Sequence, residues 1–180
     1  PVKPIINFET VKSHIQDVIA TIAPVDSQER FEGLGCIVIR ERARFKDAKT
    51  IVSDTTEVTG KRIVIATGSR ASAPPVPGLD TVPYLTNETV FAMDKQPSRL
   101  LIMGAGPIGL ELGQAMKRLG SEVAIFDIAA PLGRNEPEHA EMLVDALKDE
   151  GVQFYTPAKT KAIRKTKTGV AVEMEDGSTL

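Results

Sequence analysis

Hydrophobic residues recur every three or four positions between Phe8 and Ala23, which is the spacing of one face of an α-helix. Pro24 follows, and a proline cannot continue a helix. From Cys36 to Thr67 the pattern changes to short runs rich in β-branched residues, at 37–39, 44–46, 50–52 and 63–65. Residues 47–49 and 59–61 have the composition of turns between such runs. We therefore expect a helix over residues 8–23 and a three-stranded β-meander within residues 36–67.

The stretch Pro74-Pro75-Val76-Pro77-Gly78 interrupts the hydrophobic pattern. Prolines at this density cannot continue a helix or a central strand. We expect an extended, stiff linker here, between the meander and the second half of the chain.

After Pro97, short apolar strands alternate with amphipathic helices. The pattern predicts strands at 100–103, 123–126 and 152–155, and helices at 107–119 and 136–150 that end at Gly120 and Gly151. Strands and helices that alternate with short connections are typical of a doubly wound parallel α/β sheet. Residues 161–180 alternate between polar and apolar positions, and they predict a hairpin with its turn near Thr168-Gly169.

A glycine-rich hexamer, Gly104-Ala105-Gly106-Pro107-Ile108-Gly109, lies between the first of these strands and the first helix. In a strand–helix–strand unit such a G-x-G-x-x-G motif is typical of a Rossmann-like dinucleotide site, whereas the string alone would predict only a turn. Gly104 allows the tight turn, Gly106 allows close approach of the pyrophosphate, and Gly109 allows the helix to pack on the strand. Pro107 suits the first helical position, where its missing N–H costs nothing. The helix N-terminus then presents N–H groups to the phosphates.

Asp127 comes directly after the second strand, about twenty residues beyond the glycines, where the ribose-binding acid is expected. A carboxylate there would accept from the ribose hydroxyls and would repel a 2′-phosphate, which favours NAD over NADP. The alternative is a solvated aspartate that caps a loop. Arg134 is the only cation between Asp127 and Glu136.

Composition and charge exclude some classes of protein. The chain of 180 residues is 42% hydrophobic and 26% charged, with a net charge of −2, so it lacks the basic excess typical of nucleic-acid-binding proteins. Its apolar runs are too short to cross a bilayer. The single cysteine, Cys36, excludes an internal disulfide, and we expect it to be a buried thiol in a reducing compartment, the cytoplasm. His14 and His139 are expected to be exposed, without the spacing of a metal site. The basic residues of 40–44 and 164–167 are expected to lie on solvated faces.

Several motifs in order resemble the flavin-dependent pyridine nucleotide-disulfide oxidoreductases. They are Ile65-Ala66-Thr67-Gly68-Ser69, Pro77-Gly78, and the glycine hexamer followed by Leu110-Glu111-Leu112-Gly113. The resemblance extends over essentially the whole chain and is greatest to dihydrolipoamide dehydrogenases and mercuric reductases.

The resemblance implies that residues 1–97 form the later part of an FAD-binding domain and residues 98–180 an NAD(P)-binding domain. It places Ala66, Thr67 and Gly68 beside the flavin, although a plain turn at the end of a strand is the alternative. It places Glu111 at the nicotinamide end of the cofactor, although a surface glutamate at a helix start is equally compatible. It also implies that the first FAD glycine loop, the redox-active Cys-x4-Cys pair and the domain that forms a homodimer lie outside this chain.

We therefore expect an internal fragment that carries the nicotinamide-binding portion of a flavoenzyme. The complete enzyme would pass electrons from NAD(P)H through FAD to a disulfide or a metal, and the fragment alone would be inactive, with no catalytic residue of its own. Two alternatives stay open. One is a nucleotide-binding module without catalysis, and the other is an NADH oxidase or ferredoxin reductase type of flavoenzyme without the disulfide.

Overall fold

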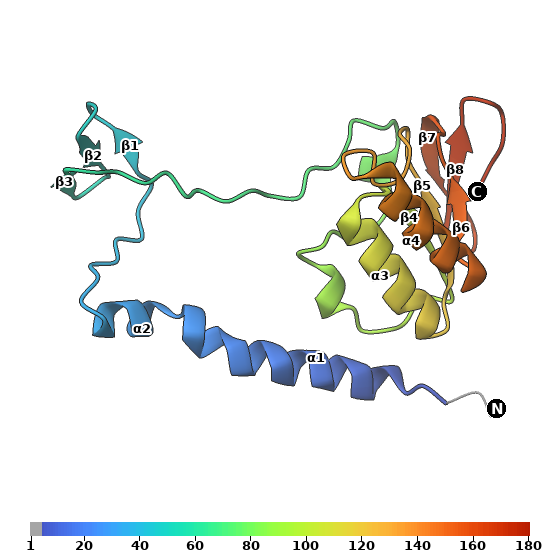
Figure 1. Cartoon of the computed structure of the whole chain (residues 1–180), viewed down its shortest axis with the longest axis horizontal. Coiled ribbons are helices and arrows are strands. Elements are labelled where there is room, and N and C mark those ends of the chain that lie inside the picture. The colour runs from blue at the N-terminus through green and yellow to red at the C-terminus, as the bar shows by residue number, and fades with distance from the viewer. Residues whose placement is uncertain (1–4) are drawn as a thin grey trace. The chain divides into compact units, whose positions relative to one another are not determined.

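A computed structural model describes residues 5–180 of the chain. The chain divides into two compact units, one containing the beginning of the chain up to His14 together with Ala71–Leu180, the other containing Ile15–Arg70. Figure 1 labels the elements of both units. None of the described helices is long and apolar enough to span a membrane.

The larger unit is built on a parallel sheet. Strands β4 (Arg99–Met103), β5 (Glu122–Phe126) and β6 (Gln153–Tyr155) lie side by side in the order β4-β5-β6. Helix α3 (Pro107–Arg118) connects β4 to β5, and α4 (Pro137–Asp149) connects β5 to β6. All five predicted elements are confirmed to within two residues. Because both connections move in the same direction along the sheet and such crossovers are right-handed, α3 and α4 cover the same face.

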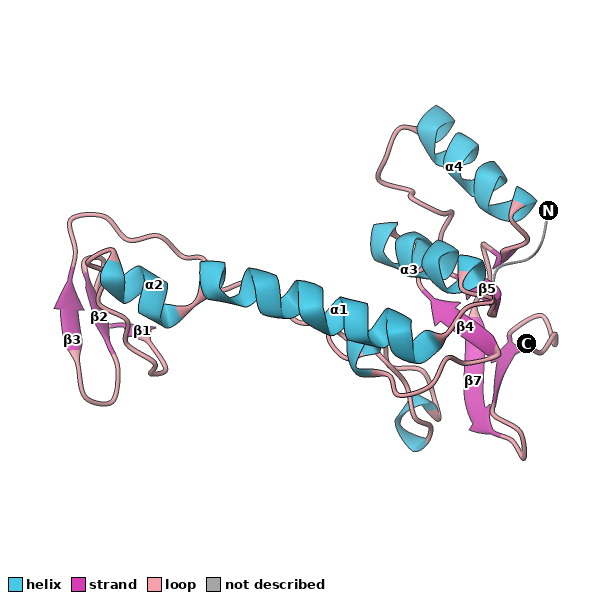
Figure 2. Cartoon of the chain, turned by 90° about the horizontal axis from the view of Figure 1, so that it is seen from below, coloured by secondary structure: helices cyan, strands magenta, loops and turns pink. Residues whose placement is uncertain are grey.

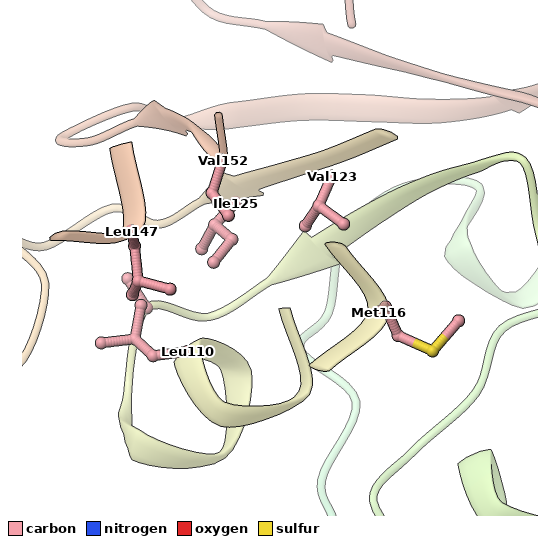
Figure 3. Packing of buried hydrophobic residues seen from close by; sticks show 7 residues of the cluster. Leu110, Met116, Val123, Ile125, Leu147 and Val152 are labelled. Atoms are coloured by element: carbon pink, nitrogen blue, oxygen red, sulfur yellow. The ribbon is translucent and has the colours of Figure 1, made fainter. Parts of the chain in front are cut away.

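Side chains along the strands point alternately to two hydrophobic clusters. On the helix side, Val123 and Ile125 of β5 pack with Leu110 and Met116 of α3 and Leu147 of α4 (Figure 3). On the other side, Phe126 packs with residues of an antiparallel hairpin, β7 (Thr160–Lys165) and β8 (Val170–Met174). Figure 2 shows α3 and α4 on one side of β4 and β5, and β7 on the opposite side. The unit therefore has three layers, and the predicted hairpin is the third.

The proline-rich connection does not remain extended throughout. Ile163 of β7 donates its N–H to the Pro77 carbonyl at 2.8 Å. Gly78 has a φ of 84°, and a Cβ at this position would lie 2.0 Å from the Ile163 carbonyl oxygen, so only glycine fits. The chain then forms two short 3-10 helices, η2 (Leu79–Thr81) and η3 (Val90–Ala92). Residues 71–97 thus pack as part of the unit that contains the parallel sheet. The boundary at residue 97 between an FAD-binding and an NAD(P)-binding domain stays a prediction.

Helix α1 (Phe8–Ile22) is confirmed, and it continues into the 3-10 turn η1 (Ala23–Asp26). The short helix α2 (Gln28–Gly33) was not predicted from the hydrophobic pattern. Its signal is the N-cap residue Ser27, whose Oγ accepts from the Arg30 N–H at 3.2 Å.

The meander has three strands, but two of the expected runs are not among them. Its strands are β1 (Arg44–Phe45), β2 (Thr50–Val52) and β3 (Glu57–Thr59), paired antiparallel in chain order. The second turn therefore lies between β2 and β3, and the prediction of a turn at 59–61 was wrong. Residues 37–39 and 63–65 pair with no strand among the described residues, and Ile37 and Val64 are 90% and 86% exposed. A strand needs a hydrogen-bonding partner, so β propensity alone does not form one here.

Candidate functional site

The glycine-rich loop forms the turn between β4 and α3. Gly104 has a φ of 115°, in the region that favours glycine, and its N–H donates to the Phe126 carbonyl at 2.9 Å. Gly106 is the N-cap of α3, and Pro107 is its first residue. A glycine N-cap has no side chain to satisfy the first N–H groups of the helix. These groups and the helix dipole together form a site that suits an anionic phosphate.

The glycines of the motif differ in what surrounds them. A Cβ on Gly109 would lie 2.1 Å from the Gly104 carbonyl oxygen, and one on Gly113 would lie 2.9 Å from Ile125 Cδ1. A Cβ on Gly106 would meet no protein atom within 4 Å. Gly109 and Gly113 therefore let the helix pack closely on the sheet, whereas the surface above Gly106 is open, as the approach of a phosphate requires. The role of Gly113 was not identified from the sequence.

Asp127 lies beside this loop, at the end of β5. One carboxylate oxygen, Oδ2, accepts from the Ala105 N–H at 2.7 Å, and Oδ1 accepts from the Ala129 N–H at 2.9 Å. The backbone carbonyl of Asp127 accepts from the Ala158 N–H at 2.7 Å. The carboxylate is thus fixed against the glycine loop. Each of its oxygens has a second lone pair, which a ribose hydroxyl could use.

The loop between β5 and α4 also contacts the glycine loop. Leu132 donates its backbone N–H to the Ala105 carbonyl at 2.9 Å. Ala105 is 1% exposed and has protein partners for both its N–H and its C=O, so neither backbone group is free to bind a ligand directly. No pattern in the sequence predicts the Leu132 contact.

Three further residues of the predicted nucleotide site are exposed on the first turns of α3. They are Pro107, Ile108 and Glu111. Their side chains are accessible to a ligand at the helix N-terminus.

The three candidate flavin contacts lie in the smaller unit. Ala66, Thr67 and Gly68 are exposed, and Gly68 has a φ of 66°. The chain bends at a left-handed glycine, as expected, but three exposed residues cannot by themselves enclose a flavin.

Cys36 is exposed, so the prediction of a buried thiol was wrong. The reason is that the strand expected at 37–39 does not form, which leaves this segment without a sheet to cover it. The exposure expected of His14 and His139 is confirmed, and Arg134 is also exposed. Within residues 5–180, no group of three or more His, Cys, Asp and Glu side chains could hold a metal ion.

Comparison with known proteins shows the family of the chain. The family model described as pyridine nucleotide-disulphide oxidoreductase matches residues 14–180. The chain belongs to this family. A mercuric reductase of Bacillus cereus is 36% identical over 132 residues, which cover 73% of this chain and 21% of the relative. A mercuric reductase of Staphylococcus aureus is 31% identical over 145 residues, covering 80% of the chain and 26% of the relative.

Two solved structures share the fold of this chain. The copper(II) complex of the HOCl-induced flavoprotein disulfide reductase RclA from Escherichia coli has a TM-score of 0.80 and 26% identity, covering 97% of this chain and 40% of that one. LpdA from Mycobacterium tuberculosis has a TM-score of 0.81 at 22% identity, covering 98% of this chain and 41% of that one, and shows the fold alone. The chain thus spans about a fifth to a quarter of the curated relatives above, and about two fifths of these structures.

Proposed function

We propose that this chain is the nicotinamide-dinucleotide-binding portion of a flavin-dependent oxidoreductase. The observation that carries the proposal is the open surface above Gly106 at the α3 N-terminus, with the Asp127 carboxylate hydrogen-bonded to the same loop. Membership of the pyridine nucleotide-disulphide oxidoreductase family supports the same proposal.

Each group of the site has a distinct part in holding the dinucleotide. The first N–H groups of α3 bind the pyrophosphate, and Gly106 lets it approach the backbone. Asp127 accepts from the adenosine ribose hydroxyls, and Glu111 lies toward the nicotinamide end. When bound, the reduced nicotinamide supplies a hydride to the flavin, and the protein supplies orientation.

The cofactor we propose is NAD(H) rather than NADP(H). A 2′-phosphate would place nearly two negative charges beside the Asp127 carboxylate, which is already held in place by two backbone N–H groups. Specificity of this kind needs a penalty against the wrong ligand as well as a fit for the right one. Arg134 is the nearest cation along the loop, and its exposed side chain is the only one there that could offset the repulsion.

The complete protein, on this proposal, passes electrons from NADH through FAD to a disulfide or a metal ion. The similarity to mercuric reductases and to a flavoprotein disulfide reductase supports these two classes of acceptor. Ala66, Thr67 and Gly68 would contribute one side of the flavin site. Dimerisation would use parts of the protein other than this chain.

Titration of the chain with NADH and NADPH tests the proposal. A charge-assisted hydrogen bond contributes about 1.5–3 kcal/mol, so NADH should bind at least tenfold more tightly than NADPH. Asp127→Ala should weaken NADH binding by roughly tenfold. It should change NADPH binding little, because losing the hydrogen bonds of the carboxylate and relieving its repulsion of the 2′-phosphate have opposite effects on NADPH affinity. Glu122→Gln, at the opposite end of β5, is the matched control and should change neither. Equal affinity of the unaltered chain for both nucleotides would contradict the NAD assignment.

A further inference from the structure

Leu132 has an unusual backbone for a leucine. Its φ is 51°, in the left-handed region that residues with a Cβ disfavour, and it is the one non-glycine residue with positive φ among residues 5–180. Two contacts hold it there. Its side chain packs against the buried cluster that contains Leu110 and Leu147, and its carbonyl accepts from the Asn135 N–H at 2.8 Å.

In this conformation the Leu132 N–H donates a hydrogen bond to the Ala105 carbonyl, in the middle of the phosphate-binding loop. That carbonyl belongs to the same peptide unit as the N–H of Gly106. Because a trans peptide is planar and its C=O and N–H point in opposite directions, fixing the carbonyl also fixes the direction of the Gly106 N–H.

The loop needs such a restraint because its peptide units are next to glycines. Gly104 and Gly106 have broad φ/ψ freedom, so the Ala105–Gly106 peptide could turn over at little steric cost. In the reversed orientation a carbonyl oxygen, rather than an N–H, would face the phosphate and repel it. Asp127 restrains the preceding peptide through the Ala105 N–H, and Leu132 restrains the following one.

We infer that Leu132 is a positioning residue for pyrophosphate binding: its backbone N–H holds the Ala105–Gly106 peptide in the orientation that aims the Gly106 N–H at the phosphate. The inference rests on the proposed function and adds to it a residue outside the glycine motif. It also assigns a role to the left-handed turn of the β5–α4 loop.

The test compares Leu132→Val with the matched control Ala130→Val in the 180-residue chain. Valine is β-branched and disfavours the left-handed conformation, so Leu132→Val should release the N–H while keeping an apolar side chain. Ala130→Val introduces the same side chain at an exposed position of the same loop. The probes are ADP-ribose, which contains the pyrophosphate, and adenosine, which does not.

We expect Leu132→Val to weaken ADP-ribose binding by about three- to tenfold, the range of one lost hydrogen bond. Adenosine binding should not change. The Gly106 amide resonance of the free protein should shift or broaden in Leu132→Val and not in Ala130→Val. Should Leu132→Val fail to fold, replacing the Leu132 amide by an ester removes the N–H alone and should give the same result.

Two outcomes overturn the inference while leaving the proposed function intact. One is equal ADP-ribose affinity of Leu132→Val and Ala130→Val. The other is an equal loss of ADP-ribose and adenosine binding, which would indicate general disruption of the site. If the unaltered chain binds neither NADH nor ADP-ribose, the proposed function itself fails, and this inference fails with it.

Discussion

Gly106 and Gly109 belong to one motif, yet the residues around them predict opposite consequences of the same substitution. Gly106→Ala adds a methyl group where no protein atom lies within 4 Å, and the φ of −83° suits alanine. We expect thermal stability close to that of the unaltered chain and a loss of NADH binding of tenfold or more, because the methyl group occupies the place of the phosphate.

Gly109→Ala instead places a methyl group 2.1 Å from the Gly104 carbonyl oxygen. The helix must move away from the strand, and we expect a loss of stability of about 1–3 kcal/mol, as for an overpacked core. Thermal denaturation together with NADH titration of both variants separates the two effects. Loss of stability in Gly106→Ala, or none in Gly109→Ala, would contradict the geometry of the loop.

Single residues also show what sequence patterns cannot reveal. Asp127 was predicted as a ribose ligand from its spacing, but its hydrogen bonds to Ala105 and Ala129 depend on the exact course of two loops. The hydrogen bond from Leu132 to the glycine loop could not be predicted from the sequence, because its donor is a backbone N–H, which every residue except proline has. Cys36 was predicted to be buried on the assumption of a neighbouring strand that does not form.

At the scale of elements, α3 and α4 are joined at their C-terminal ends by an exposed ion pair. Arg118 donates to both Glu150 oxygens, from Nε at 2.8 Å and from Nη2 at 2.6 Å, and Gln114 donates to Oε1 at 2.7 Å. The hydrogen bonds from Arg118 lower the pKa of Glu150 below its ordinary value of 4.5, and the bond from Gln114 adds to this effect.

The direction of this shift fixes the pH dependence. Because the pKa of Glu150 is lower in the folded state, the pair stabilises the fold above pH 4.5, and the effect is lost as the pH falls through the lowered value. We expect Arg118→Ala to raise the pKa of Glu150 toward the ordinary value, as measured by an NMR titration. Lys148→Ala is the control, since Lys148 pairs with Asp145 instead. An unchanged Glu150 pKa in Arg118→Ala would show that the ion pair does not persist in solution.

Elements were predicted well where their signals are local and their partners lie in the same stretch of chain. The β4-α3-β5-α4-β6 series has apolar strands, helical periodicity and glycine stops, and each strand pairs with the next. The runs 37–39 and 63–65 have equally good β-strand composition but lack a partner among the described residues. Strand formation depends on pairing, which composition does not report.

At the scale of the whole molecule, the proposed nucleotide site lies within the chain, whereas the residues proposed to contact the flavin would form only one edge of its site. Ala66, Thr67 and Gly68 are exposed, so we expect the purified 180-residue chain not to retain FAD. The visible absorption spectrum after incubation with FAD and gel filtration measures this. A stoichiometric flavin absorbance in the chain would contradict the prediction and would require flavin contacts beyond these three residues.

The central claim is that a reduced nicotinamide dinucleotide binds over the loop Gly104–Gly109 and against Asp127. Its most direct test is to add NADH to the isotope-labelled chain and to follow the backbone amide resonances. The predicted result is saturable shifts that are largest at Gly106, Ile108, Gly109 and the residues next to Asp127, with the β1–β3 sheet unaffected. Shifts confined to other parts of the chain, or none at millimolar NADH, would contradict the claim.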